Sequence, residues 1–136
     1  MHLENAAEPL ALQSASEDIW DKKYRLKDRQ GLVVDHEIND TYARVALALA
    51  EVEQEDQRAH WYERFLWALQ NGALPAGRIL SNAGATAYKP ATSTINCTVS
   101  GTIKDSMQDI LYKNLEAGLT LKAGCGIGYE FSTLRP

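Results

Sequence analysis

The chain has 136 residues, a formal charge of -4, and apolar and charged fractions typical of an ordinary globular domain. The acidic balance, with no basic cluster, gives little electrostatic reason for binding duplex DNA, so we expect no direct nucleic-acid partner. No apolar run approaches the roughly 20 residues that cross a bilayer, and the first residues lack the features of a signal peptide, so we expect a cytoplasmic protein with no membrane partner.

The N-terminal part of the sequence predicts a helical domain with its loop over residues 14–92, after a flexible arm at residues 1–13. Ser14 and Glu17 have the spacing of a capping box, in which both side chains satisfy backbone N–H groups at a helix start. A short helix follows them. Residues 32–34 then predict a brief extended segment.

Two amphipathic helices are predicted next. Asn39 or Asp40 caps the first, over residues 41–53. The second spans residues 57–70 and ends at a left-handed C-cap formed by Asn71-Gly72. Their buried faces are predicted to carry Val45, Leu49 and Val52 in the first helix and Trp61, Phe65 and Leu69 in the second.

Residues 74–94 are rich in Pro, Gly, Ser, Thr and Ala, which is typical of an ordered loop, here with one helical turn near residues 78–80. About twenty residues without regular structure inside a compact domain indicate either a functional loop or a misassigned segment, and we favour the functional interpretation. The tail, residues 93–136, predicts a strand at 93–99, a turn at Ser100-Gly101, a helix at 105–121, a glycine loop and a strand at 129–134. The fold class is therefore mainly α with a few strands.

Cys97 lies in an alternating stretch in which Ile95, Cys97 and Val99 share one strand face. One interpretation is a small buried hydrophobic residue, the commoner role of a cytosolic cysteine. The other is a redox thiol, which requires exposure to a cleft and a partner thiol. Cys125 follows a helix within the glycine loop and is not expected to form a disulfide with Cys97, so that partner would lie outside this chain.

Three further features of the tail have both a structural and a functional interpretation. Asp105 opens the predicted helix, where it is either the N-cap or a carboxylate that accepts hydrogen bonds from ribose hydroxyls. Gly124, Gly126 and Gly128 allow close approach of a ligand, but the order helix, glycines, strand is the reverse of the phosphate-binding fingerprints. Arg135 is suited to phosphate, although a surface arginine is more often solvated or paired.

Two remaining features concern partners. The predicted helix at 105–121 is apolar and carries small residues, so we expect it to pack on its own sheet and on a partner. The histidines have no metal-ligand spacing to the cysteines, and the sequence predicts no metal site. They are His2, His36 and His60.

Six groups of residues stand out by their order and spacing over residues 18–136. They are Ile19-Trp20 with Lys23-Tyr24, Asp40-Thr41-Tyr42 with Arg44-Val45-Ala46, residues 75–80, Asn96-Cys97, Gly101-Thr102-Ile103 with Asp105-Ser106-Met107, and residues 126–129 with 131–136. Together they resemble the N-terminal region of the catalytic chain of class II, adenosylcobalamin-dependent ribonucleotide reductase. The resemblance implies that residues 93–136 are the first strand-helix-strand of a ten-stranded α/β barrel, here truncated.

The resemblance also implies catalytic and substrate-binding residues. Cys97 corresponds to the first redox-active cysteine, which forms a disulfide with a second cysteine on a distant strand as the ribose 2′-hydroxyl of the ribonucleotide is removed. Asn96, Thr94 and Ser93 would bind the substrate. The deoxyribonucleotides produced serve DNA synthesis, and a thioredoxin-like reductant would restore the thiols.

An allosteric effector site is implied as well. Asp105 would contact the deoxyribose of a deoxynucleotide effector, and Arg135 its phosphates. The helix starting at Ser106 would form part of a homodimer interface. Cys125 stands where many relatives have glycine and is given no role in catalysis.

The thiyl-radical loop, the second redox cysteine and most residues for adenosylcobalamin have no counterpart in this sequence, so we expect the chain to be an oxidoreductase fragment, inactive without the remainder of the reductase chain. A non-catalytic helical interaction module and a module that only dimerises and binds effector are the alternatives. The sequence leaves open diphosphate or triphosphate substrates, class II or class I, and truncation or natural split product.

Overall fold

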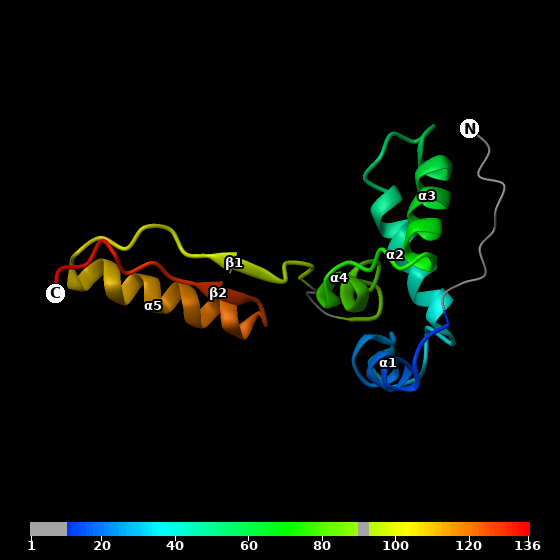
Figure 1. Ribbon diagram of the computed structural model, residues 1–136, viewed down its shortest axis with the longest axis horizontal. Helices are drawn as coiled ribbons and strands as arrows, with labels where there is room; N and C mark the ends of the chain where they lie inside the picture. Colours follow the sequence, from blue (N-terminus) through cyan, green and yellow to red (C-terminus); the bar gives the residue numbers. More distant parts are fainter. Residues whose placement is uncertain (1–10, 90–92) are drawn as a thin grey trace. The chain divides into compact units, whose positions relative to one another are not determined.

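Figure 1 shows the computed structural model of the chain, which describes residues 11–89 and 93–136. The chain divides into two units, Met1–Thr94 and Ile95–Pro136. The first unit contains α1 (Ser14–Ile19), the π-helical η1 (Trp20–Tyr24), α2 (Ile38–Ala50), α3 (Arg58–Gln70) and α4 (Gly77–Asn82), and the second contains β1 (Cys97–Val99), α5 (Met107–Lys122) and β2 (Gly126–Gly128). Over the described residues the fold is therefore mainly helical with one two-stranded sheet, as the sequence predicts.

Parts of two predicted segments lie outside the described residues. These are residues 1–10 of the predicted arm and residues 90–92 of the predicted loop. Within the described ranges, none of the helices has both the length and the apolar character needed to cross a bilayer.

The first helix begins where the sequence predicts, but its cap is different. Gln13 has an extended backbone and is the N-cap, and its carbonyl accepts hydrogen bonds from the N–H groups of Ser16 and Glu17 at 2.9 and 3.0 Å. The predicted capping box starting at Ser14 is therefore wrong, because Ser14 is already the first helical residue. The chain continues from α1 directly into η1.

The extended segment predicted at residues 32–34 is confirmed as a single antiparallel bridge between Lys27 and Val33. Gly31, with φ of 84°, reverses the chain between these two residues. The Val34 N–H donates to the carbonyl of the fully buried Leu26 at 2.9 Å. This small hairpin leads the chain into α2.

The helix α2 starts earlier than predicted. Its N-cap is Glu37, and the Asp40 carboxylate caps from inside the first turn by accepting the N–H groups of His36 at 2.7 Å and Glu37 at 3.1 Å. The helix also ends before the predicted boundary, so Val52 lies beyond it and is 83% exposed. The prediction that Val52 shares a buried face with Val45 is wrong, although Val45 itself is fully buried.

The helix α3 matches its prediction within one residue, and the predicted left-handed C-cap is confirmed. Gly72 has φ of 90°. Its N–H donates to the Leu69 carbonyl at 3.2 Å, and the Ala73 N–H donates to the Ala68 carbonyl at 3.0 Å. These two bonds are those of a Schellman motif, which satisfies carbonyls at the end of a helix.

The predicted buried face of α3 is only partly correct. Leu69 is buried and Phe65 is half-buried, but Trp61 is 37% exposed and stacks on Phe65 with ring centroids 5.6 Å apart. Exposure of Trp61 follows from its place in the first turn of α3, since the core formed with α2 lies nearer Leu69. The buried residues of that core are Tyr42, Val45, Ala46, Leu69 and Ala83.

The predicted loop at 74–94 contains α4, which extends the single helical turn expected near residues 78–80. This helix packs on α2 and on η1. Ile79 and Leu80 of α4 cover the core between α2 and α3. The described residues of this segment therefore include a helix that belongs to the first unit.

The second unit is a strand-helix-strand unit in which β1 and β2 pair in parallel, with α5 between them in the chain. The first strand is shorter than predicted, and the second strand is misplaced in the prediction, because the glycine segment itself pairs with β1. Residues 129–134 are tied by side chains instead. Tyr129 donates its hydroxyl to the Lys113 carbonyl at 2.8 Å, and Thr133 donates to the Ile103 carbonyl at 2.6 Å.

Candidate functional site

Cys97 opens β1, and its side chain is exposed in the second unit. Ile95 and Val99, predicted to share its strand face, are 60% and 75% exposed. The interpretation of Cys97 as a buried hydrophobic residue is therefore wrong for this structure. The exposure that a redox thiol requires is present.

The Cys97 sulfur lies between a side-chain amide and the neighbouring strand. The Asn96 amide Nδ2 donates to Cys97 Sγ at 3.4 Å. Across the sheet, Cys97 is in register with Gly126, whose N–H donates to the Asn96 carbonyl at 3.1 Å. Backbone pairing with β2 therefore fixes the positions of Asn96 and Cys97, the predicted substrate-binding and redox residues.

Cys125 occupies a different environment from Cys97. It is buried, and its Sγ donates to the Gly126 carbonyl at 3.4 Å. Both cysteines are free, which confirms the prediction that they do not form a disulfide.

The predicted substrate residues Ser93 and Thr94 end the first unit. The Ser93 carbonyl accepts a hydrogen bond of 2.7 Å from Asn82 Nδ2, the last residue of α4, and Thr94 is exposed. The Asn82 Oδ1 accepts the Ser81 hydroxyl at 3.2 Å. The sequence did not predict this role for Asn82, because an asparagine at a helix end is also an ordinary helix-terminating residue.

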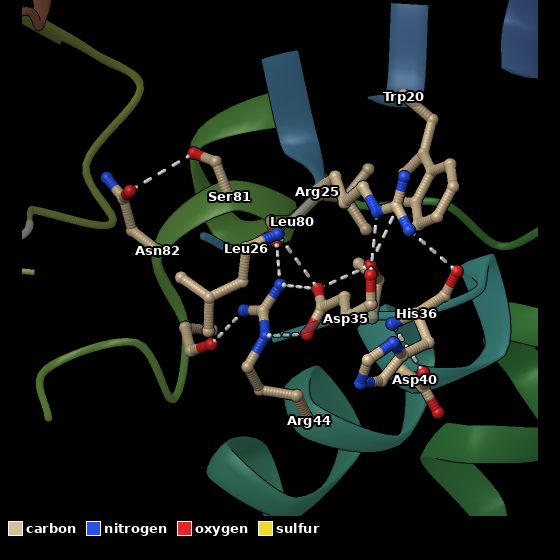
Figure 2. A network of polar contacts seen from close by, with 12 residues as sticks. Trp20, Arg25, Leu26, Asp35, His36, Asp40, Arg44, Leu80, Ser81 and Asn82 are labelled. Carbon is tan, nitrogen blue, oxygen red and sulfur yellow. Dashed lines mark hydrogen bonds and ion pairs between the residues drawn. The ribbon is translucent and has the colours of Figure 1, made fainter. Parts of the chain in front are cut away.

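Arg44 joins α2 to the C-terminal end of α4, as Figure 2 shows. Its guanidinium binds Asp35 bidentately, with Nε to Oδ1 at 3.2 Å and Nη2 to Oδ2 at 2.8 Å. The same group donates to the Leu80 carbonyl at 3.0 Å and to the Ala83 carbonyl. One buried side chain therefore satisfies carbonyls that α4 leaves without helical partners.

Asp35 is buried and fully partnered. Its Oδ2 also accepts the Thr41 hydroxyl at 2.6 Å and the Leu26 N–H at 3.2 Å, and Thr41 in turn accepts the Trp20 indole N–H at 2.9 Å. Burial by itself raises the pKa of Asp35, but hydrogen bonds from Arg44 and Thr41 outweigh it and hold the pKa below its ordinary value. Asp35 is therefore charged at neutral pH.

The side chain of Lys89 also contacts α4. Its Nζ donates to the Ser81 carbonyl at 3.1 Å. Burial, followed by the nearby Arg44 charge, lowers the pKa of Lys89, while the Asp35 carboxylate acts in the opposite direction. The last turn of α4 thus accepts hydrogen bonds from Arg44 and Lys89 and donates one, through Asn82, to the Ser93 carbonyl.

The structure brings the two predicted effector residues together. Arg135 Nε lies 3.5 Å from Asp105 Oδ2, with Arg135 strongly exposed and Asp105 partly exposed. Asp105 is not the N-cap of α5. That role belongs to Ser106, whose hydroxyl accepts the Asp109 N–H at 3.2 Å, so the structural interpretation of Asp105 as the cap is wrong.

A hollow of about 420 Å³ lies at the start of α5. The Asp109 carboxylate accepts the Lys104 N–H at 2.6 Å on its wall. The hollow is lined by Lys104, Ser106, Gln108, Asp109 and Tyr112. It therefore lies directly beside the sequence positions predicted to bind a nucleotide effector.

One face of α5 is apolar and exposed within the second unit. Residues that recur every fourth position form it, so they lie on one side of the helix. They are Met107 at 70% exposure and Leu111, Leu115 and Leu119 at 59% each. The opposite side packs on the sheet, where Ala117 is buried.

Within residues 11–89 and 93–136, no group of three His, Cys, Asp or Glu side chains is placed to hold a metal ion.

Residues 10–87 match the family model described as ribonucleotide reductase, all-alpha domain. Over 130 residues, 93% of the chain, the sequence is 33% identical to the vitamin B12-dependent ribonucleoside-diphosphate reductases of two Mycobacterium tuberculosis strains, CDC 1551 / Oshkosh and ATCC 25618 / H37Rv. The chain covers 18% of the length of these relatives.

Proposed function

Because the chain belongs to the ribonucleotide reductase family, we propose that it forms the N-terminal part of the catalytic chain of a vitamin B12-dependent reductase, which reduces ribonucleotides to deoxyribonucleotides. Residues 14–92 serve as its helical domain and loop, and residues 93–136 begin its ten-stranded α/β barrel. The remainder of the reductase chain supplies the other strands. The parallel strand-helix-strand order of the second unit supports this assignment.

The exposed thiol of Cys97 is the observation that carries the proposal. Cys97 and a second cysteine from the remainder of the chain each lose one electron and one proton and form a disulfide. The two electrons reduce the ribose C2′ carbon, and the 2′-hydroxyl leaves as water. Asn96, which donates to the Cys97 sulfur, holds that thiol beside the substrate. A thioredoxin-like protein of the cytoplasm then reduces the disulfide.

Ser93 and Thr94 bind the ribonucleotide in this proposal. Their support comes from the last turn of α4, where Asn82 donates to the Ser93 carbonyl at 2.7 Å.

Asp105 and Arg135 bind a deoxynucleotide effector beside the hollow at the start of α5. The carboxylate accepts deoxyribose hydroxyl hydrogen bonds, and the guanidinium binds phosphate. The exposed apolar face of α5 packs on the same face of a second copy and forms a homodimer. The proposed effector site therefore adjoins the start of the helix that carries the proposed dimer face.

Adenosylcobalamin supplies the radical chemistry when bound to such enzymes, but the residues described here do not fit it. The largely apolar hollow among α1, η1, α2 and α4 measures about 210 Å³, below the roughly 300 Å³ at which pockets for drug-sized ligands begin, and the larger hollow at the start of α5 is assigned to the effector. A corrinoid is larger than such ligands. We assign its binding to the remainder of the reductase chain.

Reductase activity tests the proposal directly. The chain alone, and the chain mixed with a polypeptide that supplies the remaining barrel, are assayed with adenosylcobalamin, a dithiol and each of the four ribonucleotides. We expect deoxyribonucleotide formation only in the mixture. Cys97→Ser should abolish it, because serine cannot be oxidised to a disulfide.

Cys125→Ala is the matched control, since it removes the other thiol from a buried position. It should leave the mixture active. Circular dichroism of each variant shows whether it is folded. A folded chain that stays inactive with a competent partner would overturn the assignment of Cys97.

A module that binds effector and dimerises without catalysis is the second candidate, supported by the Asp105–Arg135 pair and the exposed face of α5. Deoxynucleotides should then raise the thermal midpoint of the chain alone, and Asp105→Ala should remove that shift. Leu115→Glu should prevent dimerisation in sedimentation experiments. Val52→Glu, which adds the same charge at an exposed apolar residue of the first unit, is its control.

A further inference from the structure

Gly126 lies directly against the sulfur of Cys97. The two residues are in register across the parallel pair of β1 and β2. A Cβ placed on Gly126 would lie 3.2 Å from Cys97 Sγ, with the Asn96 carbonyl oxygen and the Cys97 Cβ farther away at 3.9 and 4.0 Å. The sulfur is therefore the atom that a side chain at position 126 would meet first.

The backbone alone does not explain a glycine at this position. The glycines with positive φ in the described residues are Gly31, Gly72, Gly84 and Gly124, and Gly126 is not among them. Gly128, two residues further along the strand, is in register with Val99, and a Cβ there would meet nothing within 4 Å. Of these two glycines in β2, only Gly126 therefore leaves room for a neighbouring side chain, that of Cys97.

A contact of 3.2 Å is shorter than the roughly 3.5–4.0 Å at which non-bonded carbon atoms attract, and sulfur is larger than carbon. Cysteine relieves such a contact by rotating about χ1, its single side-chain torsion, into another staggered well. The thiol then points in a different direction. Disulfide formation depends on that direction, because the S–S distance and the torsion about it are narrowly defined.

We propose that Gly126 is a positioning residue for Cys97: the missing side chain on β2 sets the rotamer in which the Cys97 thiol meets its partner thiol. The functional part of this inference rests on the proposed reductase function. The geometric part concerns the chain by itself. Gly126 is not a catalytic residue in this proposal, because it acts through the direction of the sulfur.

The geometric part is tested on the full chain without any partner. Gly126→Ala should move the χ1 of Cys97 to another well, as read from NMR scalar couplings, whereas Gly128→Ala should leave it unchanged. Gly126→Ala should also lower the thermal midpoint more in the Cys97 chain than in a Cys97→Ala chain, because the second lacks the sulfur. An unchanged χ1, or an equal loss of stability in both backgrounds, would overturn the inference.

The functional part is tested in the mixture that contains the remaining barrel. Gly126→Ala should lower kcat by about 10- to 100-fold with little change in KM, because a small misplacement of a reacting group costs this much. Gly128→Ala should keep both constants. A changed χ1 with full kcat would contradict the positioning role, whereas inactivity of the wild-type mixture would count against the proposed function and leave the χ1 result standing.

Discussion

The Nη2 atom of Arg44 lies 2.8 Å from the Oδ2 atom of Asp35, and both side chains are almost completely buried. The same guanidinium donates to the Leu80 and Ala83 carbonyls at the end of α4. The Arg44 guanidinium thus connects the segment before α2 to the end of α4. We therefore expect Arg44 to contribute strongly to the stability of the helical unit.

Replacement of Arg44 by Met should destabilise the first unit by about 3–5 kcal/mol, because Asp35 would remain buried and charged without its partner. Urea unfolding, monitored by tryptophan fluorescence, measures this change in the free energy of unfolding. All three tryptophans, Trp20, Trp61 and Trp67, belong to the first unit, so the signal reports that unit alone.

The matched control is Arg64→Met in α3, because Arg64 is exposed. It should change the free energy of unfolding by no more than about 0.5 kcal/mol. Equal losses for the two arginine variants would contradict a specific role for Arg44.

Acid should remove the contribution of Asp35 to the stability of the first unit. The folded-state pKa of Asp35 lies below its ordinary value of 3.8, so its stabilisation is fully present above about pH 5 and is lost as the pH falls through the folded-state pKa. The free energies of unfolding of wild type and Asp35→Asn should therefore differ most near pH 7 and converge as the pH falls through the folded-state pKa of Asp35. Urea titrations at several pH values check this, and a difference that stays constant with pH would rule it out.

Asn82→Asp should loosen the segment after α4, because a carboxylate cannot donate to the Ser93 carbonyl. We expect amide hydrogen exchange at Ala85 and Lys89 to become roughly 5–30-fold faster, which corresponds to about 1–2 kcal/mol of local stability. NMR-detected exchange measures it.

Asn71→Asp provides the comparison. The Asn71 Nδ2 donates to the Trp67 carbonyl at 2.8 Å at the end of α3, so this variant removes the same kind of bond elsewhere in the unit. It should leave exchange at Ala85 and Lys89 unchanged. Faster exchange at these amides in both variants would indicate general destabilisation.

Ser106→Ala should weaken the start of α5 by about 1 kcal/mol, because Ser106 is the N-cap that accepts the Asp109 N–H. Asp105→Ala should cost much less, since its exposed ion pair with Arg135 is worth about 0–1 kcal/mol. Hydrogen exchange of the Asp109 amide distinguishes the two variants. The reverse order of effects would restore Asp105 as the cap.

The sequence by itself determined features that depend on neighbouring residues. The 3.6-residue period predicts α3, and Asn71-Gly72 predicts its left-handed end, because both follow from local backbone preferences. The order of strand, helix and strand in the tail follows in the same way. Motif order pointed to Cys97, Asp105 and Arg135 as site residues.

Only the tertiary structure decided which residues meet. The Arg44–Asp35 pair, the bond from Asn82 to the Ser93 carbonyl and the placement of β2 on the glycine segment join residues distant in the chain. No local preference encodes such contacts, because their free energy appears only when packing removes both partners from water or aligns two strands. For the same reason, Gly126, which the sequence predicts to lie in a loop, is the register partner of Cys97 on β2.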